Sequence, residues 1–200
     1  MAKLESSFKN MVISLLGITF IASASLGLVN DVTKAPIAKA EMDKQTNAIS
    51  AVLPEYDHLG PSKMVMPNNE KDSIEIFPAL NADGAVVANA VKSYTNKGFS
   101  GYVEIMVGID VNGTVSGYQV LKHAETPGLG SKMGIWFNNS EKPGQCIIGR
   151  SLANEQLKVS KDGGRVDAIT AATISSRAFL DAVNRAYSVT ANNTNTTENQ

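Results

Sequence analysis

Residues 167–176 read Asp-Ala-Ile-Thr-Ala-Ala-Thr-Ile-Ser-Ser, and an apolar run follows them. Positions 174, 178, 182 and 186, with apolar neighbours at 179, 183 and 187, share one face at helical spacing. The stretch therefore lies where the chain enters a helix, at a terminus with unpaired N–H groups and a positive dipole. Small residues there allow a phosphate to approach the backbone. An ordinary N-cap formed by Thr170 or Thr173 explains the same residues, so both interpretations stay open.

Composition limits what kind of protein this is. The 200 residues suffice for one ordinary domain with additional segments. A formal net charge of −1 argues against nucleic acid as a general partner. Cys146 is the only cysteine, and His58 and His123 are far apart in the sequence. We therefore expect no intramolecular disulfide and no metal site.

An uncharged apolar run occupies residues 11–29, close to the ~20 residues that a membrane-spanning helix needs. It continues past Ala22, Ser23 and Ala24, where a signal peptidase could cut, and this favours an uncleaved anchor over a signal peptide. Lysines flank both ends, so their count does not decide the orientation. We predict a cytoplasmic tail (1–10), a transmembrane helix (11–29) in the bacterial cytoplasmic (inner) membrane and a main domain on the periplasmic, outer side.

The remainder predicts an α+β fold, a single exported domain in which helices flank an antiparallel sheet. Residues 30–72 are predicted as a helical and loop connector, with a helix start signal at Asp31, Thr33 and Pro36. The domain itself is predicted over 73–188, where Asp83-Gly84 and Asn112-Gly113 mark hairpin turns. Short strands are expected at 157–160 and 163–166. The Asn/Thr-rich segment 189–200 is expected to be a disordered tail.

A second junction follows the predicted strand that ends near residue 122. Residues 123–130 read His-Ala-Glu-Thr-Pro-Gly-Leu-Gly. Thr126 could cap a short helix with Pro127 in its first position. Gly128 and Gly130 leave backbone uncovered on either side of Leu129. A simple turn would explain this segment, but two backbone-exposing junctions in one small domain favour a bound ligand.

Together the two junctions resemble the FMN-binding domains of membrane redox pumps. Glu125 to Gly130 looks like their Glu-Thr-Pro-Gly-Leu-Gly segment, and residues 167–173 look like their flavinylation motif, Asp-x-x-(Ser/Thr)-Gly-Ala-Thr. With the N-terminal anchor, the chain resembles the G subunit of the Rnf ion-translocating electron transport complex, a relative of the C subunit of the sodium-pumping NADH:quinone reductase. Ala171 departs from the glycine of the motif, and its methyl group is tolerated there if φ is negative.

The resemblance implies a covalently bound cofactor. FMN would be attached through a phosphoester to the hydroxyl of Thr173, by a separate flavin transferase that uses FAD as donor. Asp167 would serve recognition by that transferase. The residues implied to contact the cofactor are Glu125, Thr126, Leu129, Gly130, Thr170, Ala171 and Ala172. No catalytic residue and no metal ligand is implied.

The implied function is that of a redox subunit of a translocase, without substrate chemistry of its own. It would relay electrons between ferredoxin and NAD while the complex moves sodium ions or protons. Its partners would be the other membrane and peripheral subunits, with Trp136 and Phe137 as candidate contacts. Two alternatives stay open: the C subunit of the sodium-translocating NADH:quinone reductase, and a membrane-anchored binding or assembly module without redox activity.

Overall fold

The chain divides into two compact units, residues Met1–Lys44 and Gln45–Gln200. The structure, a computed structural model, describes residues 7–67 and 72–197, and side chains as far as residue 191. Helix α1 (Phe8–Val52) makes up the described part of the first unit and continues into the second.

Helix α1 is the one helix of the described residues that is long and apolar enough to cross a membrane, by length and composition. The predicted transmembrane segment 11–29 lies within it. The predicted helix start at Asp31, Thr33 and Pro36 is wrong, because α1 runs through this region without a break and Pro36 lies inside it. Proline removes one backbone hydrogen bond, but here the helix continues across it.

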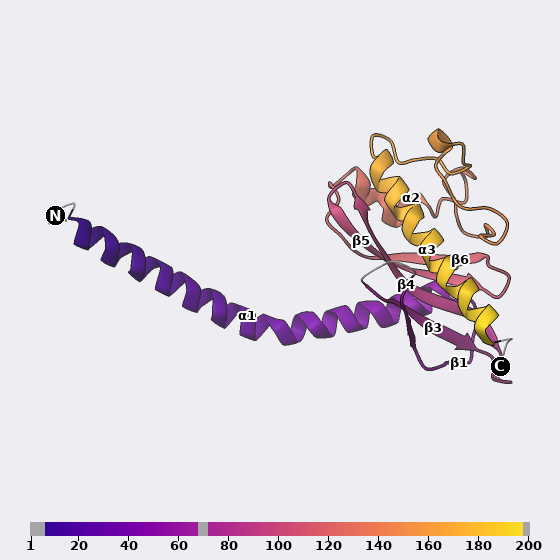
Figure 1. The fold of residues 1–200 in the computed structure, drawn as a ribbon, viewed down its shortest axis with the longest axis horizontal. Coiled ribbons are helices and arrows are strands. Elements are labelled where there is room, and N and C mark those ends of the chain that lie inside the picture. The colour runs from indigo at the N-terminus through magenta and orange to yellow at the C-terminus, as the bar shows by residue number, and fades with distance from the viewer. Residues whose placement is uncertain (1–6, 68–71, 198–200) are drawn as a thin grey trace. The chain divides into compact units, whose positions relative to one another are not determined.

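The second unit is built on an antiparallel sheet, which confirms the predicted α+β fold (Figure 1). Its strands are β1 (His58–Leu59), β2 (Lys63–Val65), β3 (Ile74–Leu80), β4 (Val86–Gly98), β5 (Gly101–Asp110) and β6 (Val115–His123). The order is β1-β3-β4-β5-β6, and β2 also pairs with β3. Gly84 and Gly113 turn the two predicted hairpins with φ values of 79° and 77°. Strands β1 and β2 lie in the segment where the sequence predicted only helix and loop.

Helix α3 (Thr173–Thr197) covers one face of the sheet (Figure 1). Its buried alanines Ala178, Ala182 and Ala186 allow close packing on the strands. The ring of Phe179 stacks on that of Phe137, with centroids 4.5 Å apart. Phe137 is fully buried. It therefore belongs to the core, and its proposed contact with partner subunits is wrong.

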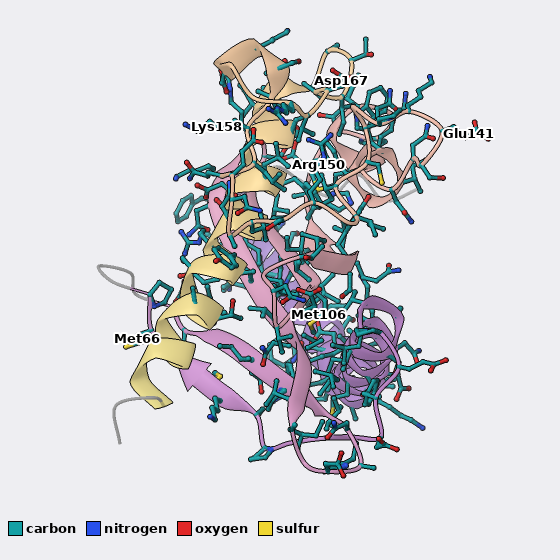
Figure 2. All side chains as sticks on the ribbon, turned by 90° about the vertical axis from the view of Figure 1, so that its right-hand side faces the viewer. Met66, Met106, Glu141, Arg150, Lys158 and Asp167 are labelled. Atoms are coloured by element: carbon teal, nitrogen blue, oxygen red, sulfur yellow. The ribbon has the colours of Figure 1, made fainter. Side chains whose placement is uncertain are left out.

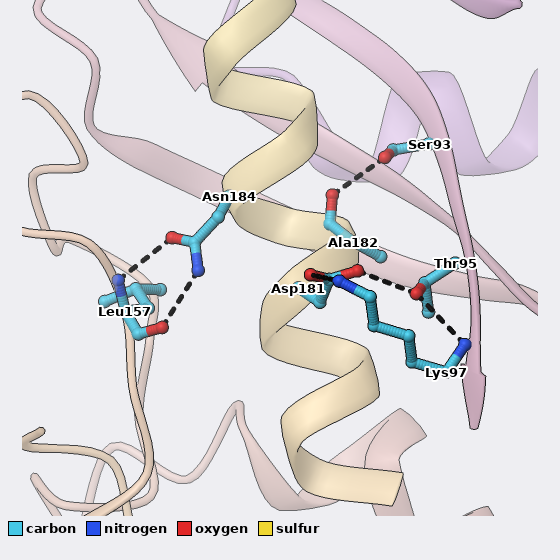
Figure 3. A network of polar contacts seen from close by, with 7 residues as sticks. All are labelled: Ser93, Thr95, Lys97, Leu157, Asp181, Ala182 and Asn184. Atoms are coloured by element: carbon cyan, nitrogen blue, oxygen red, sulfur yellow. Dashed lines mark hydrogen bonds and ion pairs between the residues drawn. The ribbon is translucent and has the colours of Figure 1, made fainter. Parts of the chain in front are cut away.

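Polar contacts fix α3 against the sheet (Figure 3). Ser93 donates a hydrogen bond of 2.7 Å to the carbonyl of Ala182. The Asp181 carboxylate accepts from Thr95 at 2.7 Å and from Lys97 at 2.8 Å. Because buried polar groups need partners, these bonds favour one position of the helix along the strands. They therefore also fix where its N-terminus lies.

The opposite face of the sheet is covered by the last residues of α1, which belong to the second unit. Ala48, Ile49 and Val52 are buried there with Ala90 and Met106. Alternate residues of a strand face opposite sides, so Val91 and Val107 join the core under α3 instead. The sheet is thus enclosed between two helical layers.

Between β6 and α3 the chain forms loops and short helices: η1 (Gly130–Lys132), α2 (Met133–Trp136) and η2 (Ser160–Asp162). Arg150 lies within these loops (Figure 2) and donates to the carbonyls of Cys146 and Pro143 at 2.7 Å each. The predicted strands at 157–160 and 163–166 are reduced to one isolated bridge, Val159 with Val166, around η2. The pattern of apolar residues there reflects burial of Leu157, Val159 and Val166 and not an extended ladder.

The start of η1 and the end of α3 also differ from the positions predicted from the sequence. The predicted helix start at Thr126 and Pro127 is wrong, since these residues form a turn and helical structure begins at Gly130. The predicted disordered tail began at residue 189, whereas α3 continues to Thr197 and buries Val189 and Thr190. Residues 198–200 lie outside the described part of the chain.

Candidate functional site

A pocket of about 310 Å³ lies where the loop after β6 meets the start of α3. This volume is at the lower end of the range for small-molecule sites. Its lining comprises Phe99, Glu125, Thr126, Leu129, Gly130, Ala171, Ala172, Thr173, Ile174 and Ser175. The structure therefore gathers the predicted attachment residue and every predicted cofactor contact except Thr170. A larger hollow of about 520 Å³ adjoins the C-terminal half of α3 and includes none of these residues.

Glu125 places a buried carboxylate in the wall of this pocket. The residue is only 5% exposed. Its Oε2 accepts a hydrogen bond of 2.6 Å from the hydroxyl of Ser175, and its Oε1 accepts one of 3.1 Å from the backbone N–H of Ser100. Buried carboxylates need such donors to offset lost hydration. Glu125 thereby joins the loop after β6 to the β4–β5 turn and to the first turn of α3.

Two glycines make room for that carboxylate. A Cβ on Gly98 would lie 2.6 Å from Oε1 of Glu125, and a Cβ on Gly130 would lie 2.6 Å from Oε2. Real Cβ contacts are not that short. Gly130 is thus required by the space around Glu125 and Ser175, in addition to lining the pocket.

Large apolar side chains surround the same pocket while remaining exposed. Phe99 is 67% exposed, Leu129 39% and Ile174 48%. Phe99 comes from the β4–β5 turn, Leu129 from the loop after β6 and Ile174 from α3. The polar side chain of Thr126 also lines the pocket. This combination suits a ligand that has a flat apolar body and polar edges.

The chain enters α3 through a tight turn at Ala171. Its φ is 59°, and it is the only non-glycine residue with positive φ among residues 7–67 and 72–197. The turn is closed by a hydrogen bond of 2.9 Å from the N–H of Ala172 to the carbonyl of Ile169. Ser176 accepts from the N–H of Ile169 and donates to the carbonyl of Ala172, each at 2.9 Å. The sequence predicted that the methyl group of Ala171 is tolerated if its φ is negative. The observed φ is positive, so that condition is not met.

Thr173 is the first residue of α3 and lies at the rim of the pocket. Its Oγ1 accepts a hydrogen bond of 3.2 Å from Nζ of Lys161 in η2. The first N–H groups of a helix have no intrahelical acceptors and carry a partial positive charge. The hydroxyl of Thr173 thus lies beside an ammonium group and a helix N-terminus, an environment suited to an attached phosphate.

Asp167 and Thr170 lie outside this lining and are exposed. The N–H of Asp167 donates to the carbonyl of Gly144 at 2.6 Å, and the carbonyl of Asp167 accepts from Nε1 of Trp136 at 2.9 Å. A Cβ on Gly144 would overlap the Asp167 carboxylate. The backbone of Asp167 is therefore held from two sides while its side chain stays at the surface (Figure 2).

Four residues of the site were not among those that the sequence predicted: Phe99, Ile174, Ser175 and Lys161. Phe99 comes from a distant part of the chain, and Lys161 lies twelve residues before Thr173. No local pattern marks either residue as a neighbour of Thr173. Ile174 and Ser175 follow the predicted motif directly, so extending the motif into the first helical turn would have included them. In the described part of the chain, no three His, Cys, Asp or Glu side chains gather as metal ligands would.

Comparison with known proteins assigns the region that contains this site to a known domain family. Residues 98–188 match the model of the FMN-binding domain. A protein of Shewanella amazonensis is 34% identical over 187 residues, which cover 90% of this chain and 86% of that protein. A protein of Escherichia coli (strain K12) is 36% identical over 182 residues, covering 85% and 87%. One of Methanosarcina acetivorans is 29% identical over 178 residues, covering 88% and 90%. All three are named as the G subunit of an ion-translocating oxidoreductase complex.

Proposed function

Because the chain belongs to the family of G subunits of ion-translocating oxidoreductase (Rnf) complexes and is a flavoprotein subunit for electron transport, we propose that its FMN is attached to Thr173 by a phosphoester. The attachment is made by a separate flavin transferase with FAD as donor. The finished protein relays electrons between the ferredoxin and NAD sides of the complex, coupled to movement of sodium ions or protons. Its partners are the other membrane and peripheral subunits.

One observation carries this proposal: the hydroxyl of Thr173 lies at the rim of a pocket whose lining fits a flavin. Phe99, Leu129 and Ile174 offer apolar surface for a ring system, while Thr126 and the backbone at Gly130 offer polar contacts to its edges. Gly98 and Gly130 leave room for the Glu125 carboxylate in the wall of that pocket. When bound, FMN supplies the capacity to take up and pass on electrons one or two at a time.

The residues of the chain position and shield the cofactor. A phosphodiester keeps one negative charge, and the start of α3 favours that charge by about 0.3–1 kcal/mol at an exposed position. The exposed apolar residues of the rim exclude water from the ring once it lies against them. A covalent bond also abolishes dissociation, which suits a domain that is exported from the cytoplasm.

We also propose that α1 is an uncleaved anchor with its N-terminus in the cytoplasm. Its length and apolar composition support a membrane span. Attachment of flavin outside the cytoplasm requires the second unit to lie on that side. Protease added to intact spheroplasts should then remove this unit, whereas complete protection would contradict the orientation.

The attachment is tested by expressing the full chain together with a competent flavin transferase. The protein is denatured and washed, and its visible absorbance is measured. We expect wild-type protein to keep a flavin band and Thr173→Ala to lose it. Ser188→Ala, which changes an exposed hydroxyl of α3 outside both the motif and the pocket, should retain the band. Colourless wild-type protein would contradict the proposal and favour an anchored assembly module without redox activity.

A further inference from the structure

A cation outside the pocket contacts the hydroxyl at which flavin is proposed to attach. Nζ of Lys161 donates a hydrogen bond of 3.2 Å to Oγ1 of Thr173. Lys161 belongs to η2, twelve residues before Thr173, and does not line the pocket. An exposed lysine ordinarily gains little from such a contact because its long side chain loses freedom. That loss is smaller if the backbone segment that carries Lys161 is already fixed.

The turn that carries Lys161 is held tightly. The N–H of Ser160 donates to the carbonyl of Val166 at 2.7 Å, and the N–H of Gly164 donates to the carbonyl of Val159 at 3.1 Å. A Cβ on Gly164 would overlap the carbonyl of Lys158, so only glycine allows this closure. The backbone around Lys161 is therefore fixed by hydrogen bonds on both sides.

An ion pair ties this turn to the helix that begins at Thr173. The Asp162 carboxylate accepts two hydrogen bonds from the Arg177 guanidinium, at 2.7 and 2.6 Å. Paired bonds of this kind fix orientation as well as distance. Arg177 lies in the first turns of α3, one turn beyond Thr173. The pair thus holds η2 beside the start of α3, with Lys161 next to Thr173.

The chemistry of an ammonium group determines what this contact can do. It has three donors and no acceptor, so the oxygen of Thr173 must accept and its own hydrogen is free to point elsewhere. During attachment, Oγ1 of Thr173 forms a bond to the flavin-side phosphorus of FAD. The bond from that phosphorus to the bridging oxygen breaks, and AMP leaves with the electron pair. The hydroxyl proton passes to a base of the transferase.

Phosphoryl transfer depends chiefly on positioning and on charge stabilisation at the phosphoryl oxygens. We propose that Lys161 is a positioning residue for flavin attachment, which orients the Thr173 hydroxyl and then neutralises the phosphodiester formed on it. This inference rests on the proposed attachment at Thr173. In its support, Lys161 contacts the acceptor atom directly and is held by a turn anchored to the same helix.

The test measures the initial rate of flavin attachment to the full chain with purified transferase and FAD, read as flavin fluorescence of denatured protein. Lys161→Gln should lower the rate about tenfold, the scale of a lost charge-assisted hydrogen bond. Lys161→Arg should recover part of the rate because it restores a cationic donor. Lys158→Gln removes a nearby charge that does not contact Thr173, and its rate should stay within about twofold of wild type.

A second measurement separates positioning from a structural role. The phosphodiester ³¹P resonance of the loaded protein should shift in Lys161→Gln and stay in place in Lys158→Gln, while the melting temperature without flavin is unchanged in both. Equal rates and resonances for the two variants would overturn the inference. Absence of covalent flavin from wild-type protein would instead refute the proposed attachment, so the two failures are distinguishable.

Discussion

Replacing Ala171 with glycine should stabilise the second unit. The backbone of Ala171 has a φ of 59°, in the left-handed region. That conformation costs an L-residue about 1–2 kcal/mol, and glycine avoids the cost. Glycine also raises the entropy of the unfolded chain, and this destabilises the folded state by about 0.4–1 kcal/mol, which offsets part of the relieved strain. The midpoints of these two ranges, about 1.5 and about 0.7 kcal/mol, predict a net gain of about 0.8 kcal/mol for Ala171→Gly.

The side chain of Ala171 is exposed, so its removal sacrifices little buried apolar area. For a domain of this size, about 1 kcal/mol corresponds to a change in melting temperature of roughly 2–4 °C. We therefore expect an increase of roughly 1–4 °C for Ala171→Gly. Trp136 is the only tryptophan of the chain and lies in the second unit, so its fluorescence reports the unfolding of that unit.

The matched control is Ala82→Gly, in the exposed turn between β3 and β4. Ala82 does not have positive φ, so glycine there relieves no strain. It only raises the entropy of the unfolded chain, which destabilises the folded state. We expect Ala82→Gly to lower the melting temperature while Ala171→Gly raises it, in the full chain in detergent without flavin. A decrease of similar size in both variants would refute the strain at Ala171.

Three further substitutions test other parts of the site and core. Gly130→Ala should destabilise the unit by about 1–3 kcal/mol in thermal unfolding, because its methyl group would crowd the Glu125 carboxylate. Tyr118→Phe should cost about 1–3 kcal/mol by the same measurement, because it leaves a buried backbone carbonyl without its 2.9 Å hydrogen bond. Hydrogen bonding to Arg177 lowers the pKa of the Asp162 carboxyl below its usual 3.8. The stability gained from a lowered carboxyl pKa is fully present above the unfolded-state pKa and is lost as pH falls through the lower, folded-state pKa. Wild type should thus exceed Asp162→Asn in melting temperature at neutral pH. The difference should shrink as pH falls below 3.8 and vanish once pH is below the lowered pKa of the folded state.

The sequence predicted those features that local residue patterns control. Asp83-Gly84 and Asn112-Gly113 marked their hairpins because the positive φ of each glycine suits a tight turn. The helical spacing of apolar residues after Ile174 predicted the face of α3 that is buried. The two junctions also predicted most of the pocket, since each lies directly at the end of a strand or the start of a helix.

Other features depend on contacts between distant residues, and the sequence did not predict them. Lys161 reaches Thr173 from η2, which the Asp162–Arg177 pair joins to α3. The burial of Glu125 depends on Gly98, which is far from it in the sequence. The positive φ of Ala171 is set by the turn around it and overrides the ordinary preference of alanine.

The central claim is that Thr173 carries the flavin, and tandem mass spectrometry tests it most directly. Trypsin cleaves after Arg165 and Arg177, so one peptide of residues 166–177 contains four hydroxyl residues: Thr170, Thr173, Ser175 and Ser176. After expression with a flavin transferase, we predict that fragment ions of this peptide place one FMN phosphoester on Thr173. An unmodified peptide, or FMN located on Thr170 or on either serine, would contradict the account.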